Sequence, residues 1–208
     1  MTAPARAALR AALERGGSHL AALTAPVPPA GFDPRSVRAF RLTGAGSSAA
    51  HARYLAALLC EELGLPARFV PLDAFPLAPD PRDVLIVFSQ GLSPNAELAL
   101  SGAPGWRAAV LVSAAATSND PERRARLAAL RAAGVTLVES AGADEFGALL
   151  RLEGPVAGYV AALRLARSLG LAPRAQLARV PAAFARGVRQ MKTGGAERRA
   201  VGALVSDG

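Results

Sequence analysis

The chain is poor in the residues that build disulfide or metal-bound frameworks. Its 208 residues include one cysteine and two histidines, so a disulfide within the chain is excluded and a metal site made of these side chains lacks ligands. We expect neither a metal ion nor a bound cofactor. Cys60 lies in the apolar segment YLAALLCEEL, where a buried core thiol is expected. His19 and His51 are expected to be satisfied or solvated rather than catalytic.

Lysine, aromatic residues and long hydrophobic runs are also scarce. The formal net charge of +8 favours nucleic acid as a partner. However, Lys192 is the only lysine, aromatic residues make up 5% of the chain, and the arginines are spread along alanine- and leucine-rich segments. Without a basic run interleaved with aromatics, we expect no nucleic-acid partner. Apolar runs are interrupted within about a dozen residues, too few to span a bilayer, and no segment has the pattern of a signal peptide. We therefore expect a cytoplasmic protein with no membrane partner.

Short apolar runs alternate with helical patterns along most of the chain. The helical patterns cover residues 47–63, a shorter segment from residue 94, and residues 121–134, where a proline lies in the first turn and Gly134 ends the pattern. Strands that alternate with helices in this way predict βαβ units. We expect a five-stranded parallel sheet with helices on both faces, a flavodoxin-like three-layer α/β sandwich. The expected strands cover residues 37–43, 67–72, 83–89, 108–114 and 135–140.

Small residues and serines follow the first expected strand. The turn Gly44-Ala45-Gly46-Ser47-Ser48 opens a helix at the carboxyl edge of the predicted sheet, where ligands of such folds bind. Backbone N–H groups at a helix start favour an anion. Three interpretations stay open: a phosphate site, a dinucleotide site of the G-x-G-x-x-A type with Asp73 after the second strand, or glycines that serve only the tight packing of strand and helix.

A second hydroxyl-rich turn follows the third strand, in the segment VFSQGLSPNAEL. Ser89 and Gln90 leave the strand, and Gly91 permits an unusual backbone conformation. Ser93 and Pro94 have the pattern of a helix start, with a serine cap and a proline at the first helical position. Two such turns at one sheet edge predict that the oxygens of a single phosphate are bound between them.

Together the two turns resemble the sugar isomerase (SIS) domain family. The segments GAGSSAAHARYLAALLCEELGLPARFVPLDAF and DVLIVFSQGLSPNAE carry the resemblance, which covers roughly residues 37–205. It is strongest to the first of the two SIS domains in the isomerase part of glucosamine-6-phosphate synthase and its shorter relatives. The chain departs from the family pattern at Gln90, where a serine usually precedes the glycine. The resemblance implies that six residues meet the phosphate of a sugar phosphate: Gly46, Ser47, Ser48, Ser89, Gln90 and Ser93.

The resemblance also implies a reaction class, that of a phosphosugar isomerase or an amino-sugar phosphate isomerase or deaminase. Isomerisation needs a base that moves a proton between adjacent carbons, and Glu145 matches the family's glutamate in the loop after the fifth strand. In the glucosamine-6-phosphate synthase relatives, the base, the ring-opening histidine and the Schiff-base lysine belong to the second domain and tail. We therefore expect this chain alone to hold the phosphate and to isomerise poorly. A homodimer is implied as well. Two alternatives stay open: a non-catalytic sugar-phosphate sensor or binding module, and a stand-alone phosphoheptose-type isomerase.

The chain is expected to contain three parts. Residues 1–30 are a helical appendage and linker, residues 31–172 are the SIS domain, and residues 173–208 are a linker helix followed by the start of a truncated second SIS domain. The last expectation rests on RAVGALVSDG, which has the pattern of a strand that runs into a new turn. A domain rarely ends on the first strand of a unit.

Overall fold

A computed structural model describes residues 3–27, 30–140, 153–172 and 179–192 of the chain. Two compact units make it up: Pro26–Ala172, and Met1–Ala25 together with Pro173–Gly208. The predicted strand at the end of the chain lies outside the described residues. No helix in the described part of the chain is both long and apolar enough to cross a membrane.

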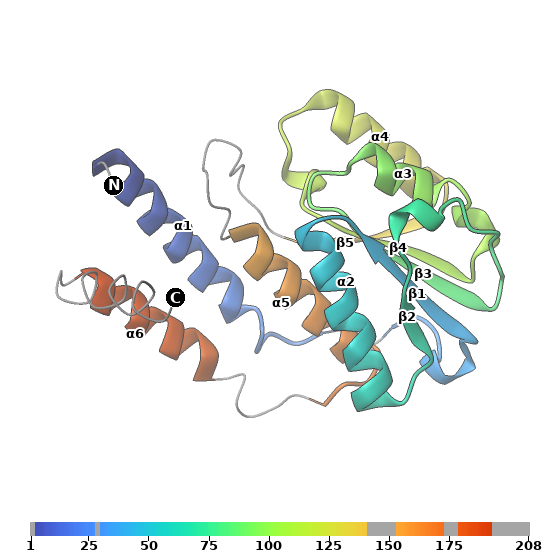
Figure 1. The fold of residues 1–208 in the computed structure, drawn as a ribbon, viewed down its shortest axis with the longest axis horizontal. Coiled ribbons are helices and arrows are strands. Elements are labelled where there is room, and N and C mark those ends of the chain that lie inside the picture. The colour runs from blue at the N-terminus through green and yellow to red at the C-terminus, as the bar shows by residue number, and fades with distance from the viewer. Residues whose placement is uncertain (1–2, 28–29, 141–152, 173–178, 193–208) are drawn as a thin grey trace. The chain divides into compact units, whose positions relative to one another are not determined.

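The smaller unit is a pair of helices, α1 (Ala3–Ala21) and α6 (Val180–Lys192), which lie against each other (Figure 1). The ring of Phe184 on α6 packs where α1 carries glycines. A Cβ atom added at Gly16 or Gly17 would lie 3.6 Å and 3.5 Å from that ring. These are ordinary van der Waals distances, so the ring lies directly against this stretch of α1.

The larger unit is built on one parallel sheet of five strands, in the order β2-β1-β3-β4-β5. The predicted sheet is confirmed. The chain steps from β1 outwards to β2 and then returns to the other side of β1 to form β3, so the winding direction reverses between β1 and β3. Open α/β sheets bind their ligands at such a switch point. The strands are β1 (Ala39–Gly44), β2 (Ala67–Phe69), β3 (Asp83–Phe88), β4 (Ala108–Ser113) and β5 (Val135–Glu139).

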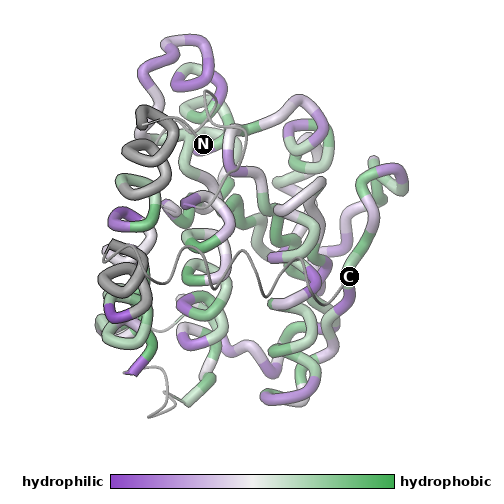
Figure 2. The backbone as a smooth tube through the Cα atoms, turned by 60° about the vertical axis from the view of Figure 1, so that its left-hand side comes forward, coloured by the Kyte–Doolittle hydropathy of each residue, from purple (hydrophilic) through white to green (hydrophobic). Residues whose placement is uncertain are grey.

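Helices cover both faces of the sheet, as predicted (Figure 1). One cluster of buried side chains, which includes Leu55 and Ala161, joins α2 and α5 to one face. A second cluster, which includes Leu100 and Leu127, joins α3 and α4 to the other. Figure 2 shows hydrophilic and hydrophobic residues alternating along the helices, as expected where one side of a helix faces a core. The helices are α2 (Ser47–Ala57), α3 (Pro94–Leu100), α4 (Pro121–Ala132) and α5 (Glu153–Ser168).

The central strand β3 is buried at every residue. Its sequence DVLIVF is a continuous apolar run after the first residue, as is typical of a parallel strand that is covered on both faces. In the register between β1 and β3, Gly44 lies opposite Phe88. The two strands therefore end side by side, and the turns that follow them begin at the same point of the carboxyl edge.

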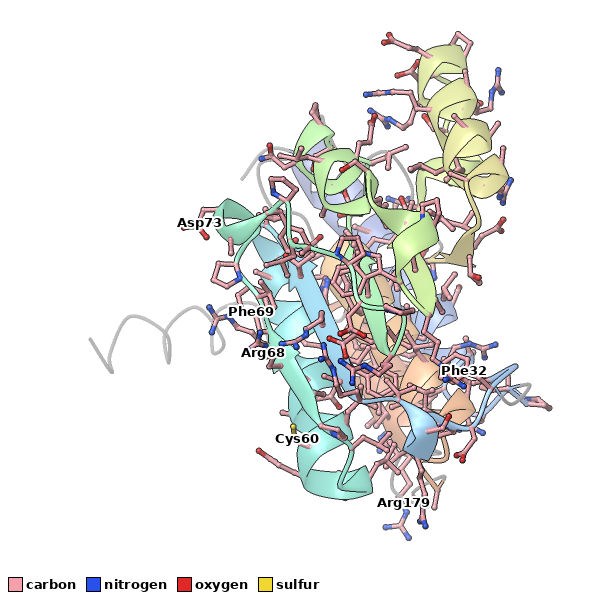
Figure 3. All side chains as sticks on the ribbon, turned by 90° about the vertical axis from the view of Figure 1, so that its right-hand side faces the viewer. Phe32, Cys60, Arg68, Phe69, Asp73 and Arg179 are labelled. Carbon is pink, nitrogen blue, oxygen red and sulfur yellow. The ribbon has the colours of Figure 1, made fainter. Side chains whose placement is uncertain are left out.

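The expectation that Cys60 is a buried core thiol is wrong. Cys60 is exposed, and its Sγ–H donates to the carbonyl oxygen of Ala67 at 3.0 Å. The segment Leu58–Glu62 forms a π-helical turn at the end of α2. Because a π turn closes over one more residue than an α turn, positions beyond it face different directions from those that α-helical periodicity predicts. Leu59 becomes the buried residue, and Cys60 lies at the surface (Figure 3).

An ionic cluster fixes the opposite, amino edge of the sheet. The side chain of Asp83, at the start of β3, is 1% exposed. Arg38 donates to both of its carboxylate oxygens, from Nε at 2.7 Å and from Nη2 at 2.8 Å, and Arg41 of β1 donates from Nε at 2.9 Å. The hydrogen bond from Arg38 is the main cause that lowers the pKa of Asp83. The cluster therefore ties the starts of β1 and β3 together.

We expect Asp83→Asn to lower the free energy of unfolding by about 3 kcal/mol, the low end for breaking a buried ion pair, because Arg38 is partly exposed. Urea denaturation at pH 7 measures this. Glu139→Gln is the matched control, because it breaks an exposed pair with Arg131 and is expected to cost between about 0 and 1 kcal/mol. The lowered pKa means that the contribution of Asp83 is present above about pH 4 and is lost as the pH falls. A variant with an acid-stability profile equal to the wild type would contradict this assignment.

Candidate functional site

Gly44 and Gly46 have different structural roles in the first turn. Gly44 ends β1, and a Cβ atom there would lie 2.7 Å from the backbone of Ser48 and 2.9 Å from the carbonyl oxygen of Phe88. The interpretation that glycine serves close packing is therefore correct for Gly44. Gly46 caps α2 with φ +57° and ψ −129°, a conformation that only glycine adopts without strain.

The turn leaves hydrogen-bond donors without acceptors at the start of α2. Gly46 has no side chain, so no side-chain oxygen caps this helix. The backbone N–H groups of Gly46 and Ser47 make no hydrogen bond with any residue that the structure describes. Ser47 is exposed and Ser48 is 8% exposed. Since the start of a helix carries partial positive charge, these donors together favour an anion.

The second turn holds its serines in an internal network. Ser89 follows β3 and is 7% exposed. Its backbone N–H donates to Val112 at 3.0 Å, and its Oγ accepts from the N–H of Ser93 at 3.0 Å. The Oγ of Ser93 caps α3 by accepting from the N–H of Ala96 at 3.4 Å, as the sequence predicts. A hydroxyl that accepts a hydrogen bond still has its own hydrogen to donate, so both serines keep one donor for a ligand.

The unusual backbone conformation in this turn occurs at Leu92. The prediction that it occurs at Gly91 is wrong. Leu92 has φ +53°, a value that leucine rarely adopts. Its N–H donates to the carbonyl oxygen of Ser89 at 3.3 Å, and its side chain is 1% exposed within the core that covers the α3 face. Burial of the leucine side chain offsets the cost of the left-handed conformation.

Gln90 is held by two neighbouring elements. Its carbonyl oxygen accepts from the N–H of Ala114 at 3.0 Å and from the Oγ of Ser113 at 3.2 Å. Its side-chain amide lies against Gly154 in the first turn of α5, in the space that a Cβ atom there would occupy. The structure therefore brings the six predicted residues to two adjacent turns, but it packs the amide of Gln90 against α5. Glu145, the predicted base, lies outside the described residues.

Ser113 and Ser140 are further polar residues at this edge, and neither was singled out in the sequence. Ser113 ends β4, and the N–H of Ser140, directly after β5, donates to its carbonyl oxygen at 3.0 Å. Both serines are buried, and Glu153, at the first position of α5, is 3% exposed. A serine at or just after the end of an apolar strand is the signal that finds Ser113 and Ser140, as it found Ser89.

His51 is neither solvated nor fully satisfied, contrary to the expectation. It is 4% exposed, and its Nε2 has no partner in the described part of the chain. It hydrogen-bonds the backbone of Pro155. Because proline has no N–H, the acceptor is its carbonyl oxygen and the donor is Nδ1. Burial lowers the pKa of His51, and the bond to Pro155 opposes that shift.

Comparison with known proteins places the fold. No family model and no curated protein matches the chain. Solved structures do match. A candidate phosphosugar isomerase of Silicibacter pomeroyi DSS-3 matches with a TM-score of 0.56 at 20% identity, over 85% of this chain and 53% of its own. A second candidate phosphosugar isomerase, from Clostridium difficile 630, matches with a TM-score of 0.57 at 12% identity, over 88% of this chain and 52% of its own. The C-terminal domain of glucosamine-fructose-6-phosphate aminotransferase from Francisella tularensis matches with a TM-score of 0.51 at 11% identity, over 85% of this chain and 51% of its own.

The chain has the SIS domain fold. It spans about half the length of these solved structures. Within the SIS fold, the two serine-bearing turns lie at the switch point between β1 and β3. The described residues contain no group of three His, Cys, Asp or Glu side chains placed to hold a metal ion. The donors at the switch point are therefore hydroxyl and backbone N–H groups.

We expect Gly46→Ala to destabilise the larger unit by about 1 to 3 kcal/mol, because alanine is strained at this φ and ψ. Gly31→Ala is the control: Gly31 is exposed, its φ is not positive, and a Cβ atom there meets nothing within 4 Å. Urea denaturation of both variants against the wild type measures the difference. Equal unfolding midpoints for the two variants would contradict the assigned backbone role of Gly46.

Proposed function

We propose that this SIS domain binds a sugar phosphate, with the phosphate between the turn after β1 and the turn after β3. The register that places Gly44 opposite Phe88 carries the proposal, because it makes both turns start side by side. Ser47 and Ser48 supply donors from one turn, and Ser89 and Ser93 from the other. The N–H groups of Gly46 and Ser47, which have no acceptor among the described residues, add the favourable field of a helix end.

The chemistry of the donors suits a phosphate monoester. Neither turn contains a lysine or an arginine, so what the two turns themselves offer the anion is neutral hydrogen bonds and a helix dipole. Hydrogen bonds to an ionised oxygen are stronger than those between neutral groups. Such a site recognises the tetrahedral, oxygen-rich phosphate group and leaves the rest of the sugar to other loops.

A dinucleotide is the weaker candidate for the same turn. That hypothesis needs an acidic residue at the end of the second strand to contact a ribose. β2 ends at Phe69, whereas Asp73 lies beyond it in a 3₁₀ turn, Leu72–Ala74. Asp73 is exposed and points outwards from the domain (Figure 3). The geometry therefore favours the phosphate over the dinucleotide.

The reaction that we propose for the protein is isomerisation of a phosphosugar or of an amino-sugar phosphate. Its alternative is a binding module without catalysis. The two differ in whether a base takes a proton from the sugar's second carbon. Glu145 is the candidate for this step if the chain itself supplies the base. Among the described residues, Glu153 is the one buried carboxylate at the carboxyl edge.

Calorimetric titration with fructose-6-phosphate, inorganic phosphate and NAD tests the binding proposal. We expect fructose-6-phosphate and phosphate to bind and NAD not to bind. Ser47→Glu is expected to lower the affinity for both fructose-6-phosphate and inorganic phosphate by more than about tenfold, because it adds a like charge to the site. The variant remains folded, since a carboxylate in the first turn of a helix is favourable. Ser101→Glu is the control, because Ser101 is an exposed residue at the far end of α3. Binding of NAD alone would restore the dinucleotide hypothesis.

Deuterium incorporation from heavy water into fructose-6-phosphate and glucosamine-6-phosphate tests the chemistry. We expect slow or no exchange with the 208-residue chain, because a bound phosphate positions the sugar without supplying a base, whose help is worth about a hundredfold to ten-thousandfold. If exchange is rapid, Glu145→Gln is expected to abolish it and to leave phosphate affinity nearly unchanged. Rapid exchange that survives in Glu145→Gln would remove Glu145 as the base.

A further inference from the structure

One side chain from each half of the candidate site packs against α5. Gln90 comes from the turn after β3, and His51 comes from α2, the helix that follows the turn after β1. Gly154 and Gly158 are four residues apart, so they lie on the same side of α5. The amide of Gln90 occupies the Cβ space of Gly154, and the imidazole of His51 occupies that of Gly158. His51 lies one helical turn after Ser47 on α2. The first two turns of α5 therefore pack directly on both halves of the proposed phosphate site.

The ring of His51 is fixed from several directions. Nδ1–H donates to the carbonyl oxygen of Pro155, while Nε2 is buried without a partner among the described residues. Tyr159 of α5 meets the ring edge-on, with centroids 4.7 Å apart, and Phe88 of β3 lies 6.0 Å away. This arrangement requires the neutral ring with the proton on Nδ1.

We propose that neutral His51 is a positioning residue of the phosphate site, which holds the start of α5 against α2 and thereby keeps the turn at Gly46–Ser48 in its binding shape. This inference rests on the proposed function. Protonation would place a charge and a new Nε2–H donor in a buried position that has no acceptor among the described residues, and a buried unpaired donor or charge is costly. The ring then leaves its place against Gly158, and the contact between α2 and α5 loosens.

Among the residues that the structure describes, few titratable groups surround His51. On α5 these are Glu153, which has an interaction partner of its own, and Tyr159; on α2 it is Tyr54, which packs edge-on against Tyr159. The neighbouring residue of β3, Phe88, does not titrate. No charged side chain contributes to the lowered pKa of His51. A loss of binding on acidification that His51→Asn abolishes is therefore assigned to His51 itself.

The experiment is calorimetric titration with sodium sulfate and with fructose-6-phosphate between pH 5 and pH 8. Sulfate keeps a constant charge over this range, so its affinity reports on the protein alone. For the wild type we expect constant sulfate affinity above about pH 7 and a loss of about tenfold below the titration of His51. The free energy of unfolding falls over the same range, because the unfolded chain binds the proton more readily.

Three variants separate positioning from simple packing. His51→Asn keeps a donor for Pro155 and does not titrate, so we expect affinity near that of the wild type and no dependence on pH. His51→Ala removes the donor, and Gly158→Ala displaces the ring; both are expected to lose about tenfold in affinity at pH 7.5. His19→Asn, at the other histidine, is the control and is expected to keep the wild-type pH profile. Urea denaturation of each variant shows that it is folded.

The outcomes distinguish this inference from the proposed function. A wild type that binds neither anion overturns the proposed function. Wild-type binding that His51→Ala leaves unchanged, or sulfate affinity that rises on acidification, overturns the inference and leaves the function standing. Nitrogen-15 NMR of the free protein adds a readout that needs no ligand: it is expected to show His51 protonated on Nδ1 at pH 7.5. Protonation on Nε2 instead would overturn the inference even if the variants bind weakly.

Discussion

The close approach of three backbone segments at Gly44 is the constraint on which the rest of the site depends. Strand β1 ends there, the first turn of α2 passes over it, and the carbonyl oxygen of Phe88 lies beside it, each nearer than a side chain allows. This contact sets the distance between α2 and β3. It also places the serines that follow β1 and the serines that follow β3 around one point of the sheet edge.

Much of the fold follows from local sequence. Strands such as β3 are apolar runs bounded by polar residues, and helices such as α3 begin with a serine cap and a proline, so their positions are encoded within a few neighbouring residues. The serine-bearing turns are predictable for the same reason. The π-helical turn that exposes Cys60 is different, because it departs from the regular helical periodicity by which the sequence is interpreted.

The parts of the site that sequence alone misses are those set by contacts between distant segments. The left-handed conformation of Leu92 is held by a core that other strands and helices complete. The burial of His51 needs Pro155 and Gly158, and the direction of the Gln90 amide needs Gly154, all far along the chain. A glycine inside a helix usually lowers the stability of that helix. In α5 such glycines mark the places where polar side chains from other elements enter.

The ionic cluster that stabilises the sheet and the candidate site lie at opposite edges of the sheet. The buried carboxylate of Asp83 and its two arginines secure the amino edge, while the two serine-bearing turns and the start of α5 lie at the carboxyl edge. Substitutions in the loops of the carboxyl edge therefore act on a scaffold that is anchored elsewhere. A domain built in this way is able to change what its carboxyl-edge loops bind during evolution while its strand pairing stays intact, since folding and binding depend on different residues.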